Sequence, residues 1–320
     1  MTRTARLKAF AKLNLGLRVL LKRPDGYHEL RTVFQTISLA DRIDVAYTPA
    51  AETRITIDGT PHIHDNLVEK AARLVLGELR LSAEVHFDLK KRIPAGAGLG
   101  GGSTDAAAVL LSLPVLAGKQ VAEGRLFELA NQLGSDVPFF LHGGTALGLG
   151  RGEELYPLPD QRQRRGLLVA PAIHSSTADA YRDLSERLTS IPLQNKLVSF
   201  QRQVWKGSGE TAANDFEEVV FARHPELGKI RDRLQSVGAE PAAMTGSGSA
   251  IFGIFENATQ FRHVLSQART LFEGERTFPI SFVSRAQYRS AWRRALASHI
   301  PQASKPNVKE DLWPPPSLYA

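Results

Sequence analysis

The sequence has 320 residues, 42% of them hydrophobic, and a formal net charge of +7, which is compatible with a globular protein of two domains. It contains no cysteine, and this excludes disulfide bonds, thiolate zinc sites and a cysteine nucleophile. It has no run of about 18 apolar residues, and its first ten residues lack the apolar stretch of a signal peptide, so we expect a cytoplasmic protein with no membrane partner.

The first half of the chain predicts mainly strands, followed by helices. Alternating apolar and polar residues indicate one or two strands at residues 7–19 and further strands at 30–39, 41–48 and 53–59. A turn at Pro24, Asp25 and Gly26 follows the first stretch. Helical spacing then indicates a helix at 66–80, and a strand follows at 83–94. After a glycine-rich stretch and its helix, we expect helices at 125–134 and 135–140, the second capped by Asp136, and one strand at 143–158.

The second half predicts a different order of elements. Strands are expected at 166–172 and 276–284, helices at 177–188, 217–238 and 259–272, and two strands within 242–255 that are joined by Gly246, Ser247 and Gly248. This β-α-(α)-β-β-α-β order is typical of a ferredoxin-like unit. We therefore expect domains at residues 1–159 and 160–297. Residues 298–320 form a proline-rich tail without a core pattern, which favours disorder.

The most informative stretch is IPAGAGLGGGSTDAAAVLL, residues 93–111, with five glycines between Gly96 and Gly102 directly before an apolar helix. Such a cluster costs stability unless something must approach the backbone closely. With Ser103 or Thr104 as the helix cap, the free N–H groups of the loop and first turn would bind a phosphate together with the helix dipole. A flexible turn or linker is the alternative.

Known phosphate loops of other kinds fit this stretch poorly. Gly96, Gly98 and Gly101 match the dinucleotide fingerprint, but Glu123, at the distance of the ribose-binding acid, introduces a helix and does not end a strand. No Gly-Lys-Ser/Thr of a P-loop follows the glycines, and the catalytic motifs of protein kinases are missing downstream. A third kind of phosphate loop remains.

The stretch PAGAGLGGGSTDAA resembles the ATP loop of the GHMP kinase superfamily of small-molecule kinases, which includes galactokinase, homoserine kinase and mevalonate kinase. AKLNLGL near the N-terminus and MTGSGSAIFG near the end of the second half match the same superfamily. Together with RPDGYHEL and GSDVPFF, they are most similar to a branch whose substrate is a cytidine diphosphate ester of a small alcohol. The similarity covers about residues 7–284, with threonine at Thr104 and Thr245 where serine is common.

The resemblance implies an α/β fold of two halves, the first like a ribosomal protein domain and the second ferredoxin-like, with the active site in the cleft between them. It implies ATP as phosphoryl donor. The sequence shows no obvious metal cage, so we expect Mg²⁺ to be carried in on ATP and no protein metal site. The implied ATP loop runs through Pro94, Ala95, Gly96, Ala97, Gly98, Leu99, Gly100, Gly101, Gly102, Ser103 and Thr104.

The resemblance also implies roles for single residues. Asp136 would act as general base toward the substrate hydroxyl, and Lys12 would keep it ionised and offset phosphate charge. The remaining substrate-binding residues would be Asn14, Tyr27, His28, Thr177, Tyr181, Gly246, Ser247 and Gly248, with the tyrosines and His28 around the cytosine.

From the local sequence alone, each of these residues has a structural alternative. Asp136 could be only a helix cap, and Lys12 a solvated strand residue. Tyr27 could be a turn residue, Tyr181 a core residue, and the second glycine turn a simple hairpin. For the whole chain, the alternatives are another kinase of the superfamily, a non-catalytic nucleic-acid-binding protein, and a dehydrogenase. The 40 basic residues against 33 acidic ones favour anionic partners. Neither arginine cluster, at 162–165 or 289–294, has the aromatic pattern of an RNA-binding sheet, so we expect no nucleic-acid partner.

Overall fold

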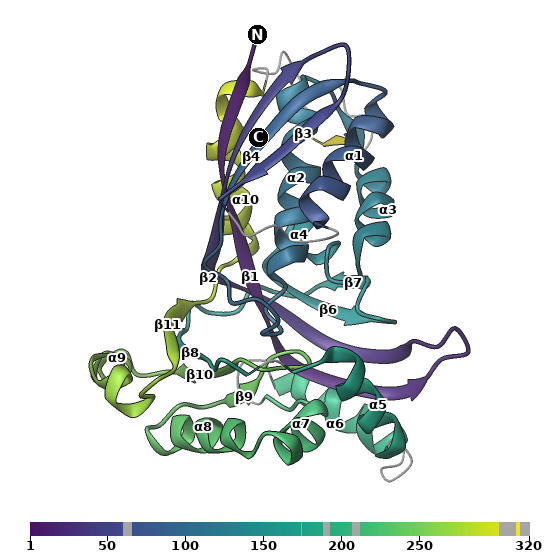
Figure 1. Cartoon of the computed structure of the whole chain (residues 1–320). Helices are drawn as coiled ribbons and strands as arrows, with labels where there is room; N and C mark the ends of the chain where they lie inside the picture. The colour runs from purple at the N-terminus through teal and green to yellow at the C-terminus, as the bar shows by residue number, and fades with distance from the viewer. Residues whose placement is uncertain (60–65, 174, 188–192, 207–211, 301–311, 314–320) are drawn as a thin grey trace.

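The structure, a computed structural model, describes residues 1–59, 66–173, 175–187, 193–206, 212–300 and 312–313. Figure 1 shows two parts, one above the other: an upper part with β3, β4 and helices α1 to α4, and a lower part with β8 to β11 and helices α5 to α9. Strands β1 (Arg3–Lys22) and β2 (His28–Pro49) run through both. The two strands predicted at 30–39 and 41–48 are thus one continuous strand.

The sheet of the upper part is organised around β2. One edge of β2 pairs antiparallel with β1 along nearly its whole length. The other edge pairs with β4 at residues 42–49 and with β6 at residues 32–35. Strand β2 therefore connects the β3–β4 end of the sheet to the β6–β7 end. The remaining strands extend it in the order β3-β4-β2-β6-β7, where the bounds are β3 (Arg54–Asp58), β4 (Ala83–Lys90), β6 (Thr145–Leu149) and β7 (Glu154–Pro157). The predicted strand at 143–158 is therefore a hairpin of two strands.

Helix α2 (Gly101–Ala117) is the centre of the upper core. Its residues from Thr104 to Leu116 are all buried, which explains why most of the helix following the glycine loop is apolar. It packs against β1, β2 and the other helices of this part, which are α1 (Leu67–Leu79), α3 (Glu123–Leu133) and α4 (Phe139–His142). A rigid, fully buried helix of this kind fixes the position of the glycine loop at its N-terminus.

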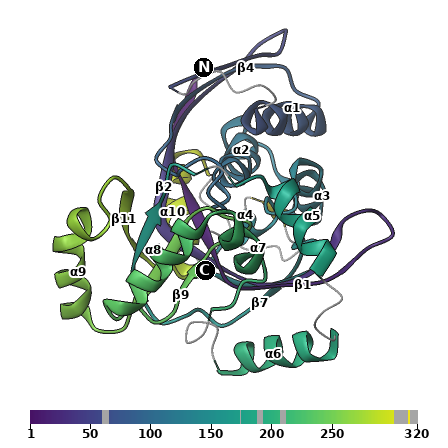
Figure 2. The ribbon, with the colours of Figure 1, turned by 60° about the horizontal axis from the view of Figure 1, so that its bottom comes forward.

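The lower part has the predicted ferredoxin-like order of elements. Its antiparallel sheet has the order β11-β8-β10-β9, built from β8 (Arg165–Ala170), β9 (Ala242–Met244), β10 (Ile251–Phe255) and β11 (Arg276–Ser281). The helices are α5 (Thr177–Arg187), α6 (Leu193–Lys206), α7 (Phe216–Arg223), α8 (Pro225–Ser236) and α9 (Ala258–Leu271). Figure 2 shows α6 apart from α8 and α9, on the side of the β1–β2 hairpin, and it contacts β1.

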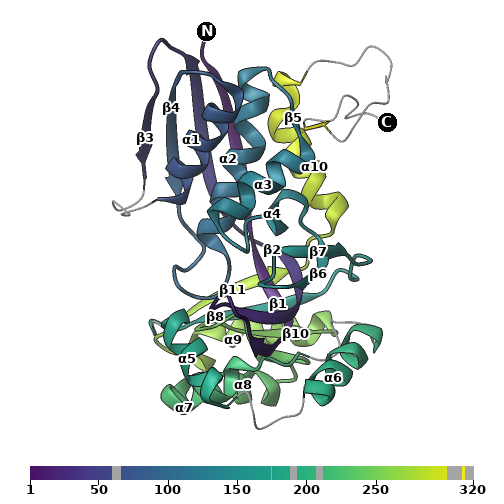
Figure 3. The same ribbon diagram turned by 90° about the vertical axis from the view of Figure 1, so that its right-hand side faces the viewer.

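Two segments cross between the predicted domains. Leu17, Val19 and Leu30 of the β1–β2 hairpin belong to the apolar core of the lower part. Helix α10 (Arg285–Leu296), which the sequence analysis did not predict, returns to the upper part, where it contacts β1 and α2 (Figure 3). Its Tyr288 and Trp292 are buried in the core of that part. The boundary between 159 and 160 stays a prediction, but α10 packs on the first domain although it was assigned to the second.

Most of the predicted tail lies outside the described residues. A short 3₁₀ helix (Ala297–His299) directly follows the last residue of α10. Further on, β12 (Leu312–Trp313) pairs with β5 (Val121–Ala122), and the indole Nε1 of Trp313 donates a hydrogen bond to the carbonyl oxygen of Leu111 at 2.7 Å. For these two residues the expectation of disorder is wrong, because they are tied to helix α2.

Candidate active site

Lys12 lies where β1 passes between the two parts of the molecule. Its side chain is buried, with the residue only 3% exposed, and its ammonium group donates to Oδ1 of Asn14 at 2.6 Å. The same Nζ lies 3.4 Å from Oδ2 of Asp136 and 5.4 Å from the ring centre of Phe34. The interpretation of Lys12 as a solvated strand residue is therefore wrong, because a lysine buried this deeply needs charged and polar partners.

Asp136 lies in the turn before α4, and its side chain is 32% exposed. The cap position of α4 is Pro138, and no side chain caps the helix, so the interpretation of Asp136 as an N-cap is also wrong. Its carboxylate instead faces the ammonium group of Lys12. An ionised carboxylate that is partly open to solvent and paired with a buried cation can accept a proton from a bound hydroxyl.

The glycine stretch enters α2 through Gly100, whose left-handed backbone conformation (φ 71°) starts the helix without any side-chain cap. The prediction that Ser103 or Thr104 caps the helix is wrong, since both lie within the first turn. The hydroxyl oxygen of Thr104 is buried and has no hydrogen-bond partner among the described residues. The backbone N–H groups of the first turn keep the orientation that suits an anion.

Two of the five glycines are required by contacts within the protein. A Cβ on Gly98 would lie 2.1 Å from the carbonyl oxygen of Thr245, and one on Gly100 would lie 2.8 Å from the ring of Phe140. Gly102 is different, because its nearest neighbour would be a methyl carbon of Leu67 at 3.6 Å. The bare backbone at Gly98 therefore allows another chain segment to approach the loop closely.

That segment is the second glycine turn, which the structure places against the first. Ala250 donates from its backbone to the carbonyl oxygen of Ala97 at 3.3 Å, and a Cβ on Gly246 would lie 3.2 Å from Cα of Gly98. The backbone N–H of Asn14 donates to Oγ1 of Thr245 at 3.0 Å. Strand β1 and both glycine turns therefore meet at one point.

Hydroxyl groups surround the tip of the second turn. Oγ1 of Thr177 and Oγ of Ser247 lie 2.8 Å apart, and Oγ of Ser175 donates to the carbonyl oxygen of Ser247 at 3.0 Å. The amide of Asn214 holds the turn from below by donating to the carbonyl oxygens of Met244 and Gly246, at 2.9 and 2.7 Å. Ser175 was not predicted as a site residue, because only the folded chain brings it next to Ser247.

The aromatic residues form a second cluster. The rings of His28 and Tyr181 are stacked, with centroids 4.8 Å apart, and Nε2 of His28 lies 2.7 Å from Oγ of Ser185. Burial lowers the pKa of His28. Burial raises the pKa of Tyr181, and the negative charge of Asp136 raises it further. The structure therefore brings together two of the three aromatic residues that were predicted to surround the cytosine.

Tyr27 is not part of that stack. It is 56% exposed, and its ring lies under the guanidinium group of Arg151, 4.7 Å away. The structure therefore brings His28 and Tyr181 together but gives Tyr27 a different neighbour, on the turn between β6 and β7.

A buried ionic cluster behind the glycine loop was also missed by the sequence analysis. The ammonium group of Lys91 pairs with Asp41 and, at 2.6 Å, with Oδ2 of Asp105 in α2. Asp41 also accepts hydrogen bonds from the backbone N–H groups of Arg92 and Ile93, at 2.5 and 2.9 Å, and so holds the strand that leads into the loop. Only the tertiary fold reveals this cluster, since its members lie on three separate elements.

Two kinds of feature are absent from the part of the chain that the structure describes. No group of three or more histidine, aspartate or glutamate side chains there is arranged to hold a metal ion. Within the same part of the chain, no helix combines the length and apolar character that crossing a membrane would require.

Comparison with known proteins identifies the family. Models of the GHMP kinases N terminal domain and of the GHMP kinases C terminal domain match residues 66–144 and 197–274. A 4-diphosphocytidyl-2-C-methyl-D-erythritol kinase of Solibacter usitatus is 51% identical over 99% of this chain and 98% of its own length. The chain belongs to this kinase family.

Further relatives agree with the family assignment. A 4-diphosphocytidyl-2-C-methyl-D-erythritol kinase of Geobacillus kaustophilus is 37% identical over 82% of this chain and 92% of its own length. A crystal structure of 4-(cytidine 5'-diphospho)-2C-methyl-D-erythritol kinase superimposes with a TM-score of 0.71 at 36% identity, covering 88% of this chain and 99% of the other. Mevalonate kinase from L. major, at 16% identity and a TM-score of 0.65, shares the fold over 88% of this chain and 97% of its own. The predicted GHMP kinase fold is confirmed.

Proposed function

We propose that this protein transfers the γ-phosphoryl group of ATP to a hydroxyl of 4-diphosphocytidyl-2-C-methyl-D-erythritol, the 2-hydroxyl by family resemblance, in the non-mevalonate isoprenoid pathway. The family assignment supports the kinase activity and the use of ATP. The single structural observation that supports the chemistry best is the pair of Lys12 and Asp136, which lies beside two glycine turns in contact with each other.

The first glycine loop is proposed to bind the ATP phosphates. The N–H groups at the start of α2 would donate to phosphate oxygens, and the helix dipole would add a favourable interaction. Leu67, which lies next to Gly102, would line the same site. The orphaned hydroxyl of Thr104 fits a role toward a phosphate oxygen or the ion that ATP carries. Bound Mg²⁺ would neutralise phosphate charge, and Ser103 and Thr104 are the residues we place beside it.

In the transfer step, the substrate hydroxyl oxygen forms a bond to the γ-phosphorus while the bond from that phosphorus to the β–γ bridging oxygen breaks, so ADP leaves with the bridging oxygen. Asp136 accepts the hydroxyl proton. The ammonium group of Lys12, held by Asn14, faces the carboxylate of Asp136 and stabilises negative charge on the transferred group. Because Lys12 is buried and already positioned, this charge needs little reorganisation during the reaction.

The cytidine end is proposed to bind at the aromatic cluster. The rings of His28 and Tyr181 are already in contact, so the cytosine would stack against this pair and would not lie between the two rings. Tyr27 would have to leave Arg151 to join it. Ser247 and Thr177, with Gly246, Gly248 and Asn14, would contact the erythritol and phosphate groups. We propose a cytoplasmic enzyme with no nucleic-acid partner.

The test is ADP release by the purified protein with Mg-ATP and one acceptor at a time. We expect release with 4-diphosphocytidyl-2-C-methyl-D-erythritol and none above background with galactose, homoserine or mevalonate. ADP release only with another acceptor would support the ATP-binding role of the loop and would refute the proposed cytosine site. No release with any acceptor, together with salt-dependent RNA binding, would favour a non-catalytic nucleic-acid-binding protein instead.

A further inference from the structure

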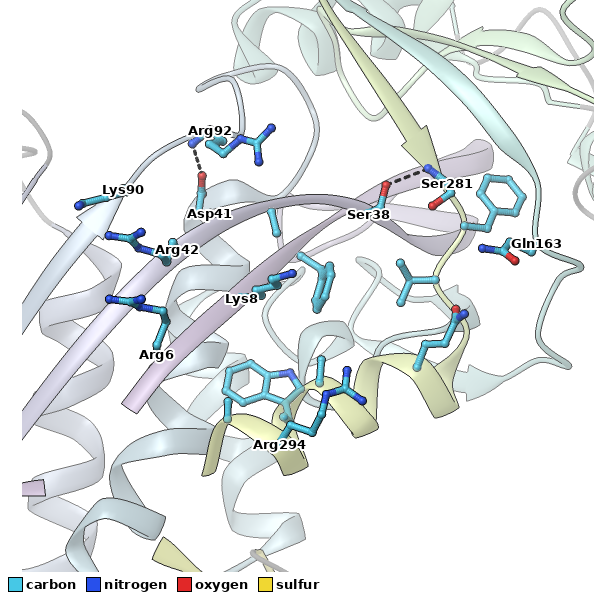
Figure 4. Close-up of a pocket in the computed structure, with 18 residues that line it drawn as sticks. Arg6, Lys8, Ser38, Asp41, Arg42, Lys90, Arg92, Gln163, Ser281 and Arg294 are labelled. Carbon is cyan, nitrogen blue, oxygen red and sulfur yellow. Dashed lines mark hydrogen bonds between the residues drawn. The ribbon is translucent and has the colours of Figure 1, made fainter. Parts of the chain in front are cut away.

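A large groove lies on the face of the upper sheet that is turned away from α1 and α2. Along β1, the residues Leu7 and Ala9 point into the core, while Arg6, Lys8 and Phe10 alternate with them and line the groove. Helix α10 and the segment after β11 form its walls, and its volume is about 960 Å³. Figure 4 shows Arg6, Lys8 and Arg42 along the strands and Arg294 on α10.

One row of this sheet face consists of cations only. Lys8 of β1 is the register partner of Arg42 of β2, and Arg42 is the partner of Lys90 of β4. Like charges directly opposite one another across strands destabilise a sheet. Three cations in a row across three neighbouring strands are therefore a structural cost that an anion bound in the groove would relieve.

Acidic residues of the neighbouring row compensate only part of this charge. Asp44 pairs with Arg6 at 2.6 Å and with Arg42 at 3.2 Å, and Asp88 lies 3.6 Å from Lys90. Among the residues that the structure describes, Lys8 forms no ion pair, and neither does Arg92 at the end of the groove. Asp41, the acidic residue among those that line the groove, already forms an ion pair with Lys91. The groove keeps a surplus of positive charge.

The next row of the same face is apolar. Phe10 is the register partner of Ala40, and although Phe10 and Trp292 are themselves buried, the partly exposed Ala40, Ala291 and Ala295 present apolar surface to the groove. A basic row next to an apolar one complements a molecule with an anionic group at one end and an apolar body at the other. A nucleic-acid backbone would use the cations but would leave the apolar floor uncovered.

The groove is separate from the proposed ATP loop. The side chains of Lys90 and Arg92 line it, while Lys91 between them pairs with Asp105 of α2 and lies next to Gly101 on the other face. Successive side chains of a strand point to opposite faces of the sheet. A molecule in the groove would therefore not occupy the place of the ATP phosphates.

We propose that this groove is a second ligand site, which binds an organic phosphate ester with an apolar body. The phosphate lies at Lys8, which Figure 4 shows between Arg42 of β2 and Arg294 of α10, and the apolar body covers the partly exposed Ala40, Ala291 and Ala295. The proposal of this second site holds whichever alcohol accepts the phosphoryl group at the active site.

The test is isothermal titration of the full chain with n-hexyl phosphate while ADP saturates the ATP site. We expect one binding site, and at least ~10-fold weaker binding of both inorganic phosphate and 1-hexanol, because each lacks one half of the ligand. Affinity should fall as salt is added, because the cations that line the groove are largely exposed.

Adjacent arginines of α10 provide a matched pair of variants. Arg294 lines the groove and Arg293 does not, although both are exposed and lie in the last turn of the helix. Arg294→Glu should weaken binding of n-hexyl phosphate by at least ~10-fold, and Arg293→Glu by less than ~2-fold. Lys8→Gln, at an exposed strand position, should behave like Arg294→Glu.

Several results would overturn the proposal. These are absence of binding, equal losses in Arg293→Glu and Arg294→Glu, or inorganic phosphate binding as tightly as n-hexyl phosphate. An RNA oligonucleotide that binds more tightly than n-hexyl phosphate, and is lost in Arg294→Glu, would assign the groove to nucleic acid instead. Circular dichroism of each variant checks that the fold is intact.

Discussion

Replacing Gly98 by alanine tests whether the two glycine turns meet as the structure shows. Gly98 has a φ of +76°, and a side chain there would come within 2.1 Å of the carbonyl oxygen of Thr245. The left-handed backbone costs about 1–2 kcal/mol for an L-residue, and the overlap adds about 1–3 kcal/mol. We therefore expect Gly98→Ala to lower the free energy of unfolding by roughly 2–5 kcal/mol.

Gly102→Ala is the matched control within the same loop. Its backbone is not left-handed, and an added Cβ would meet only Leu67, at 3.6 Å. Alanine has a higher helix propensity than glycine. The free energy of unfolding of Gly102→Ala should therefore equal that of the unmodified protein or exceed it by up to ~1 kcal/mol. Urea-induced unfolding followed by tryptophan fluorescence measures both variants, read as a change in midpoint at constant slope. Equal midpoints for Gly98→Ala and the unmodified protein would refute the described contact between the turns.

Three further predictions concern the site and its support. Tyr181→Ala should raise KM for the cytidine substrate at least ~10-fold more than KM for ATP, measured by initial rates of ADP release, because base stacking contributes ~1–3 kcal/mol; an equal rise in both would count against the aromatic site. Lys12→Met should lower kcat by ~10²-fold or more, since one preorganised donor is lost, and an unchanged kcat would remove Lys12 from the transfer step. Burial raises the pKa of Asp105 from 3.8 to about 7, so its contribution to stability is present below pH 3.8 and lost as pH rises through about 7. In the unmodified protein, the free energy of unfolding should therefore fall as the pH rises from about 5 to about 7. Asp105→Asn should make this fall shallower by up to ~1 kcal/mol per pH unit, measured by urea unfolding at each pH. The same pH dependence in both proteins would contradict the raised pKa of Asp105.

Much of the fold follows from local patterns in the sequence. Alternation located the long strands, and the Gly246–Gly248 turn correctly predicted two antiparallel strands around it. Helix α10 was missed, although Tyr288, Trp292 and Leu296 recur every four residues, as expected for one buried face. Its return to the upper core depends on tertiary packing, which no local pattern contains.

The site shows the same division between local and tertiary information. The family resemblance implied the roles of Lys12 and Asp136, for which the local sequence alone favoured structural alternatives. Their separation of 3.4 Å and the burial of Lys12 required the structure. The predicted caps at Ser103 or Thr104 failed, because a left-handed Gly100 can begin a helix without a side-chain cap. The cluster joins Asp41 of β2, Lys91 just after β4 and Asp105 of α2, and no sequence spacing indicates that these three side chains meet.

The most direct test of the account is kcat of Asp136→Asn with Mg-ATP and saturating 4-diphosphocytidyl-2-C-methyl-D-erythritol. Asparagine keeps the size of the side chain and removes the proton acceptor facing Lys12. We predict a fall of at least ~10²-fold in kcat, with the urea midpoint little changed, since loss of a general base costs ~10²–10⁴-fold. A kcat within about twofold of the unmodified enzyme would contradict the assignment of Asp136 as the base.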